Sequence, residues 1–125
     1  MKFLCLIAAM KLLEDMGPDE AAGHFAEYQA LFNELKSSGK VVSCSRLVPP
    51  REAVTVWVRN GEVHMTDGPF AETKEQLGGF ILLDVADMQE ALAIAARIPG
   101  ARQGCVEVRP VADDSATLGV LMATA

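Results

Sequence analysis

Asp67 is the residue whose neighbours best suit acid–base chemistry, and it opens the run Asp67-Gly68-Pro69-Phe70. A carboxylate beside Gly-Pro, backed by an aromatic ring, can lose part of its water and then serve as a general acid or base. The same four residues are also ordinary turn chemistry, in which Asp caps its own backbone, Gly takes an unusual φ and Pro stiffens the chain. The run therefore predicts a corner, and Asp67 is the candidate catalytic residue.

Two cations are candidates for binding an anionic group of a ligand. Lys74 stands in the mixed charged run of residues 72–75, where it either binds a carboxylate or phosphate as a point charge or belongs to a solvated loop. Arg46 lies between polar residues on a predicted strand. Its guanidinium either orients an anionic ligand or pairs with an acid across an interface.

Aromatic and imidazole side chains supply the remaining ligand candidates. His24 and Tyr28 lie one turn apart on a predicted helix, so they share a face. Trp57 and His64 face each other on a predicted hairpin and suit a flat ligand, although a dimer contact or an exposed sheet face explains them equally well. Phe70 is an aromatic plug beside the predicted corner.

The sequence predicts no metal and no cofactor. Its only two histidines are far apart in the chain, and the three cysteines lack the spacing of a zinc site. Gly78-Gly79 matches neither a dinucleotide-binding nor a P-loop pattern, and a close backbone approach or a bulge explains these glycines better. No cysteine has an evident base beside it, so thiol catalysis is not expected.

Composition limits the class of partner and the compartment. The 125 residues predict one domain over residues 1–111, with a tail of residues 112–125 that the pattern does not place. A net charge of −6 argues against nucleic acid, and no apolar run is long enough to span a membrane. Three unspaced cysteines favour the reducing cytoplasm. Residues 3–9 read as a strand buried on both faces, because the run is short, apolar and unbroken, rather than as a signal peptide.

The order of predicted elements indicates the fold. A helix opens at Pro18 and ends near Gly39, and a second begins at Asp87, whose carboxylate suits a capping box with Glu90. The predicted strands are residues 3–9, 41–48, 80–85 and 105–111, with a hairpin between the second and third. This order is β-α-β-β-α-β with an extra hairpin, which predicts a ferredoxin-like α+β sheet with both helices on one face. The apolar face left open predicts a homodimer.

Asn60-Gly61 fixes the register of the hairpin, because this dipeptide strongly favours a two-residue turn. Arg59 then faces Glu62, and Trp57 faces His64. The same register puts the apolar residues on one face, whereas a slip by one residue would mix the two faces. That apolar face consists of Val56, Val58, Val63 and Met65.

Three stretches resemble the DGPF family, a branch of the YCII-related proteins: "TDGPFAETKEQLGG", "DVADMQEALAIAARIPGA" and "VEVRPV". The resemblance covers about residues 1–111. It implies a ferredoxin-like fold in a dimeric α/β-barrel arrangement. It also implies an association of some members with extracytoplasmic-function sigma factors, and, in the wider group, an enzyme site with a His on the first helix and an acid near a cavity.

This sequence departs from the family pattern at that histidine. Counted back from Gly39, the family's position is nearer to Tyr28 than to His24, which lies one turn earlier. The expected cavity lies between the open sheet face, the first helix and the 67–79 loop. The resemblance itself implies little chemistry. The first function hypothesis is a small-molecule-binding homodimer, which by analogy with the fold is a cofactor-independent lyase or isomerase with Asp67 as acid–base and His24 or Tyr28 assisting. The alternative is an accessory or regulatory module, linked to a sigma factor, or a member without chemistry.

Overall fold

The computed structural model describes residues 1–9, 11, 13–70 and 75–113. Two α-helices, six β-strands and three short 3₁₀ turns make up this part of the chain. In chain order they are β1 (Lys2–Ala9), η1 (Leu13–Asp15), α1 (Pro18–Ser37), β2 (Val41–Arg46), η2 (Pro50–Glu52), β3 (Val54–Arg59), β4 (Glu62–Asp67), β5 (Gln76–Asp84), α2 (Met88–Ala95), η3 (Pro99–Arg102) and β6 (Gly104–Pro110).

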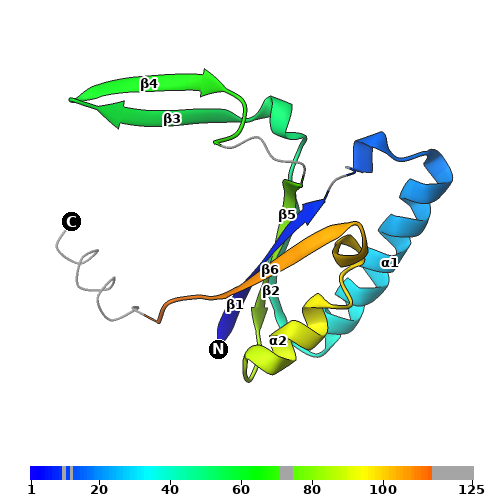
Figure 1. Cartoon of the computed structure of the whole chain (residues 1–125). Helices are drawn as coiled ribbons and strands as arrows, with labels where there is room; N and C mark the ends of the chain where they lie inside the picture. The colour runs from blue at the N-terminus through cyan, green and yellow to red at the C-terminus, as the bar shows by residue number, and fades with distance from the viewer. Residues whose placement is uncertain (10, 12, 71–74, 114–125) are drawn as a thin grey trace.

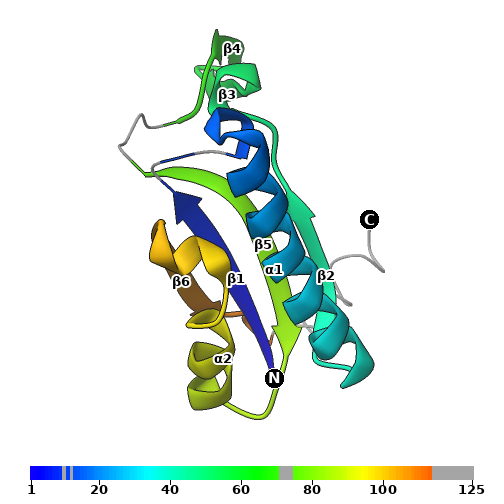
Figure 2. The same ribbon diagram turned by 90° about the vertical axis from the view of Figure 1, so that its right-hand side faces the viewer.

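Four strands form one antiparallel sheet in the order β2-β5-β1-β6, and β3 and β4 form a separate hairpin. Both α-helices lie on the same face of the four-stranded sheet, as Figure 2 shows. The central strands of this sheet are β1 and β5, which are the first and third strands of the predicted β-α-β-β-α-β order when the hairpin is left out. This arrangement confirms the ferredoxin-like α+β fold.

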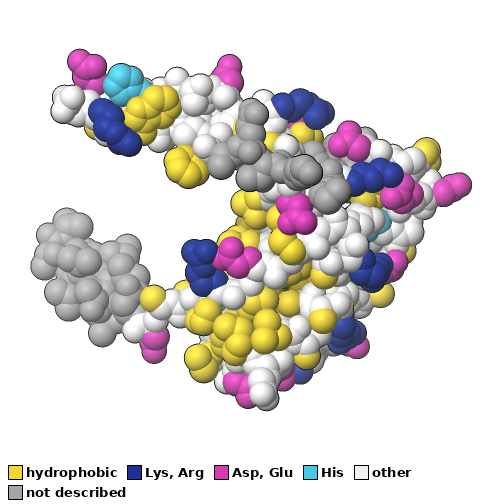
Figure 3. Space-filling view, in the orientation of Figure 1, with side chains coloured by type: hydrophobic (Ala, Val, Ile, Leu, Met, Phe, Trp, Pro, Cys, Tyr) yellow, Lys and Arg dark blue, Asp and Glu magenta, His cyan; other side chains and the backbone are white. Residues whose placement is uncertain are grey.

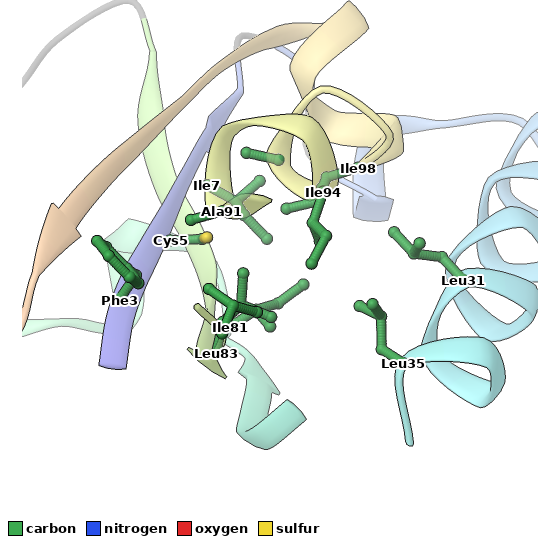
Figure 4. Packing of buried hydrophobic residues seen from close by; sticks show 12 residues of the cluster. Phe3, Cys5, Ile7, Leu31, Leu35, Ile81, Leu83, Ala91, Ile94 and Ile98 are labelled. Carbon is green, nitrogen blue, oxygen red and sulfur yellow. The ribbon is translucent and has the colours of Figure 1, made fainter. Parts of the chain in front are cut away.

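The core lies between that sheet face and the two helices (Figure 4). β1 alternates in burial because successive side chains of a strand point to opposite faces. Phe3, Cys5 and Ile7 point to the helices and are buried, whereas Leu4 and Leu6 on the other face are half-buried. The prediction that this strand is buried on both faces is therefore wrong for the single chain, because the helices cover only one face.

Helix α1 begins and ends as the sequence predicts. Pro18 is its first residue, and Gly39 takes a φ of 71° just past its end. Leu31 and Leu35 of its apolar stripe are buried against the sheet. Phe25 of the same stripe is 59% exposed, so the N-terminal half of the helix stands further from the core than its C-terminal half.

Helix α2 is held at its start by two reciprocal hydrogen bonds. The Glu90 N–H donates to the Asp87 carboxylate at 2.9 Å, and the Ala86 N–H donates to the Glu90 carboxylate at 3.0 Å. This is the predicted capping box, with the return bond made one residue before the cap. The Lys40 ammonium and this Ala86 N–H hold the pKa of Glu90 below its ordinary value, with the backbone N–H as the larger cause.

Strand β5 begins four residues earlier than the predicted start at Phe80, and Gly78 and Gly79 lie inside it. Ile7 pairs with Gly79 and Ala8 pairs with Leu77, so Gly78 is the extra residue of a β-bulge. A side-chain carbon on Gly79 would lie 2.8 Å from the backbone oxygen of Ser45. The bulge and the close backbone approach together account for both glycines.

The β3–β4 hairpin leaves the body as an arm, on the side of the sheet away from the helices (Figure 1). Its pairs Arg59–Glu62 and Trp57–His64 confirm the predicted register, and Asn60 and Gly61 take φ values of 53° and 76°. Gly68, with a φ of 101°, turns the chain at the base of the arm. Its N–H donates to the Ala53 carbonyl at 2.7 Å, which confirms the corner.

Candidate ligand-binding site

A cavity of about 370 Å³ lies between the middle of α1, from His24 to Asn33, and the helix-covered face of the sheet. This volume is within the range of small-molecule sites. Strands β1, β2 and β5 form one wall, with Gly78 and Gly79 of the bulge among its residues. The expected position was between the open sheet face, the first helix and the 67–79 loop. The first helix and Gly78 and Gly79 do line the cavity, but the sheet face that lines it is the one that the helices cover.

His24 and Tyr28 bring imidazole and phenol groups to the same wall of this cavity. Their ring centroids lie 4.9 Å apart at an interplanar angle of 68°, an edge-to-face contact made by residues one turn apart on α1. Burial lowers the pKa of the His24 imidazole, while the nearby Glu27 carboxylate opposes this shift. A neutral imidazole can accept a proton, which suits His24 to act as a base.

The Tyr28 hydroxyl is fixed by the turn that follows α2. It accepts a hydrogen bond of 3.2 Å from the Gly100 N–H. Burial raises the pKa of Tyr28, so the hydroxyl keeps its proton at neutral pH. No described residue accepts that proton in a hydrogen bond, so Tyr28 can donate it to a ligand.

Two positive side chains, three side-chain amides and one serine complete the polar part of the lining, namely Lys11, Arg46, Gln29, Asn33, Gln103 and Ser45. Lys11 and Arg46 line the cavity, and Lys11 also donates to the Glu20 carboxylate at 2.8 Å. The lining residues that the structure describes include no Asp or Glu. The side-chain oxygen of Gln103 is buried and has no hydrogen-bond partner among the described residues. The cavity is therefore suited to a neutral or anionic ligand.

The remaining predicted site residues lie away from this cavity. Trp57 and His64 stack on the hairpin with ring centroids 5.5 Å apart. Asp67 ends β4, is exposed, and forms no hydrogen bond or ion pair within the described part of the chain. Phe70 is 94% exposed. Lys74 lies outside the described residues. The structure thus brings His24, Tyr28 and Arg46 together and separates them from the residues of the arm.

Thiol and metal chemistry have little support in the described residues. Burial raises the pKa of Cys5 and of Cys44, and a hydrogen bond to Glu75 raises that of Cys105. A raised pKa lowers the fraction of reactive thiolate. Within residues 1–9, 11, 13–70 and 75–113, no three metal-binding side chains gather. In the same part of the chain, no helix is long and apolar enough to cross a membrane.

The model of the YCII-related domain matches residues 1–114 of this sequence. The chain belongs to the YCII-related family. An uncharacterised protein of Rhizobium meliloti is 43% identical to this sequence over 88 residues, which are 69% of this chain and 71% of that protein. The predicted resemblance is therefore confirmed at the level of the family.

A solved structure of similar fold comes from Burkholderia phenoliruptrix. It is the 5-chloro-2-hydroxyhydroquinone dehydrochlorinase TftG, in complex with 2,5-dihydroxybenzoquinone. The match covers 93% of this chain and 98% of that one, with a TM-score of 0.50 and 15% sequence identity. At this identity the similarity shows that the two chains share a fold.

Gly100 and Gln103 are among the cavity residues that sequence reasoning missed. Both lie on or beside η3, which packs against β1 and α1 through contacts between residues far apart in sequence. No local pattern indicates such a position, because the tertiary approach of η3 to α1 creates it.

Proposed function

We propose that this YCII-related protein binds a small, largely apolar molecule with hydroxyl or carbonyl oxygens in the cavity between α1 and the sheet. The observation that carries the proposal is the pair of His24 and Tyr28 on the wall of a cavity of about 370 Å³. An apolar cavity with a few convergent polar groups, one of them with a shifted pKa, is typical of a binding or active site.

The proposed chemistry is a cofactor-independent lyase or isomerase reaction. The His24 imidazole takes a proton from the substrate, and the electron pair released moves toward a substrate oxygen or expels a leaving group. The Tyr28 hydroxyl, held by the Gly100 N–H, donates a hydrogen bond to the oxygen that gains negative charge. The dehydrochlorinase of similar fold supports this class of reaction.

We also propose that the protein is a homodimer, in which a second copy occupies the angle between the arm and the open sheet face. Five apolar side chains on one face of the hairpin are 55–69% exposed, namely Val54, Val56, Val58, Val63 and Met65. Figure 3 shows the arm standing clear of the body. A two-stranded hairpin is marginally stable alone in water, so this apolar face needs a cover.

Asp67 shares the apolar face of the arm, because it pairs with Val54. In the proposed dimer its carboxylate therefore lies at the interface. If Asp67 takes part in proton transfer, it does so at the site of the second copy. The three free cysteines are consistent with a cytoplasmic protein, which is part of the proposal.

Titration calorimetry with hydroquinone and 2,5-dihydroxybenzoquinone tests ligand binding. We expect wild-type protein to bind at least one of these compounds and His24→Ala to bind it about ten-fold more weakly. His64→Ala is the matched control, because it removes an imidazole that stacks on Trp57 outside the cavity, and we expect it to keep the affinity. The proposal fails if wild-type protein binds neither compound, or if His24→Ala binds as tightly as wild type.

A second candidate function is a non-enzymatic accessory module whose partner is another protein, such as a sigma factor. The exposed apolar face of the arm favours it, because that face suits a protein surface. Mixing the purified chain with the sigma factor and measuring mass by light scattering separates the candidates. A mixed complex that forms in place of the homodimer supports the module, and an unchanged homodimer excludes it.

A further inference from the structure

The described lining of the cavity is positively charged, although the chain as a whole is acidic. Lys11 and Arg46 line the cavity, and its described lining residues include no Asp or Glu. The full sequence carries a net charge of −6, so the general field of the protein repels an anion. Any attraction of the cavity for an anion must therefore come from groups of the cavity itself.

The glutamates of helix α1 do not neutralise the cavity from within. Three of them form ion pairs with basic residues of other segments, and these pairs are Lys11–Glu20, Arg97–Glu34 and Arg102–Glu27. None of the three glutamates lines the cavity. The Lys11 ammonium has three N–H donors, and the Glu20 carboxylate takes one of them at 2.8 Å. A second acceptor can therefore share this cation.

Arg46 ends β2 on the helix-covered face of the sheet. Residues two apart in a strand share a face, and Cys44 packs against the core between the sheet and the helices. A guanidinium has five N–H donors in a planar fork that matches a carboxylate, and more than one acceptor can use them. Arg46 can therefore bind an anion in the cavity as well as its partner within the chain.

Gly79 lies between Arg46 and the part of the cavity that holds the Tyr28 hydroxyl. It pairs with Arg46 on one side and with Ile7 on the other. Gly100, which donates its N–H to the Tyr28 hydroxyl, lies against Ile7, since a side-chain carbon at Gly100 would be 2.6 Å from an Ile7 methyl carbon. Arg46 and Ile7 are two strand spacings apart, which is about 10 Å. A ligand that reaches from β2 to the Tyr28 hydroxyl thus crosses a position without a side chain.

We propose that the ligand carries a carboxylate, which Arg46 binds at the β2 side of the cavity while Lys11 adds positive charge. The hydroxyl or carbonyl oxygen of the same ligand then lies at Tyr28, beside His24. The chemical class is a small aromatic or enolic acid, with its carboxylate and its reacting oxygen at different positions of the molecule. This inference rests on the proposed function and names the substrate class of that site.

Titration calorimetry with 2,5-dihydroxybenzoate and 2,5-dihydroxybenzamide tests this inference, because the amide keeps the ring and both hydroxyl groups but has no charge. We expect wild-type protein to bind the carboxylate about ten-fold more tightly, since charge-assisted hydrogen bonds are stronger than neutral ones. In Arg46→Gln we expect this preference to disappear while the affinity for the amide stays. In Lys11→Gln we expect a smaller loss of preference, because the Glu20 carboxylate already shares that cation.

Arg59→Gln is the matched control, because it removes the same charge from the arm, outside the cavity lining. We expect it to keep the preference. The inference is overturned if wild type binds carboxylate and amide alike, a comparison that needs no variant to fold. It is also overturned if Arg46→Gln loses no more of the preference than Arg59→Gln.

The same titrations separate this inference from the proposed function. If wild type does not distinguish the two ligands but His24→Ala weakens both, the proposed function stands and only the carboxylate is wrong. If wild type binds neither of them, nor hydroquinone, nor 2,5-dihydroxybenzoquinone, the proposed function itself fails and this inference fails with it.

Discussion

The cavity and the arm divide between them the features expected of one site. The cavity holds His24 and Tyr28 on one wall, where a hydrogen bond from the Gly100 N–H fixes the Tyr28 hydroxyl and the Tyr28 ring contacts the His24 ring. The arm carries Trp57, His64 and Asp67, with the turn of the family signature at its base, but it has almost no contact with its own body. In the described chain, the region with the recognisable motif is therefore separate from the region with a shaped cavity.

This difference favours a role in the proposed assembly, rather than in chemistry, for the corner at the base of the arm. The corner at Gly68 sets the direction of the arm through two bonds, from the Gly68 N–H to the Ala53 carbonyl and from the Thr55 hydroxyl to the Gly68 carbonyl. In the proposed dimer the arm meets a second copy, which requires a fixed direction. In the proposed reaction His24 and Tyr28 need instead a rigid body behind them.

The largest expected effect is loss of the dimer when a charge enters the apolar face of the arm. Val63→Lys places an ammonium group among exposed valines that the second copy covers in the proposed dimer, and burying an unpaired charge is strongly unfavourable. We expect light scattering to give twice 13.4 kDa for wild type and 13.4 kDa for the variant.

Thr66→Lys is the matched control for that prediction. Thr66 lies on the same strand as Val63 but on the other face of the hairpin. We expect this variant to remain dimeric. A monomeric wild type would remove the assembly role of the arm altogether, and equal masses for the two variants would show that the apolar face does not matter.

The hairpin was predictable from sequence because its determinants are local. Asn60-Gly61 fixes the turn, and alternation of Val58 and Arg59 then fixes which face each residue takes. The start of β5 was not predictable in the same way. Gln76 and Leu77 read as the end of a charged loop, and only their pairing with Ala9 and Ala8 of β1 makes them part of a strand.

A smaller effect is expected from a methyl group in the cavity wall. Gly79→Ala places a carbon 2.8 Å from the Ser45 backbone oxygen, so β2 and β5 must separate. We expect urea unfolding to show a loss of about 1–3 kcal/mol. Gly78→Ala is the control, since its nearest atoms lie 4.0 Å away. Equal losses would contradict the close approach and leave only the bulge to explain both glycines.

The candidate site was only partly predictable for a related reason. His24 and Tyr28 share a helix face by spacing alone, so sequence reasoning paired them correctly as neighbours. Gln103 reaches the same cavity from a turn 75 residues further along the chain than Tyr28, through the hydrogen bonds of Gly100. A periodicity within one element carries no information about such a contact.

The smallest expected effect is a change in the pH dependence of stability. Because burial lowers the pKa of His24 from its ordinary 6.5, protonation favours the unfolded chain. The stabilisation from the neutral imidazole is present above about pH 6.5 and is lost as the pH falls toward the lower folded value. Glu20, Glu27 and Arg102 are the charged groups that act on this imidazole.

We expect His24→Asn to lose less unfolding free energy than wild type between about pH 8 and pH 5, measured by urea denaturation at each pH. His64→Asn is the matched control, because the His64 imidazole stacks on Trp57 in the arm instead of lying in the cavity wall. If His64→Asn altered the pH dependence of the unfolding free energy more than His24→Asn does, the comparison between the cavity and the arm would be reversed. The arm would then hold the histidine whose neutral form the fold requires.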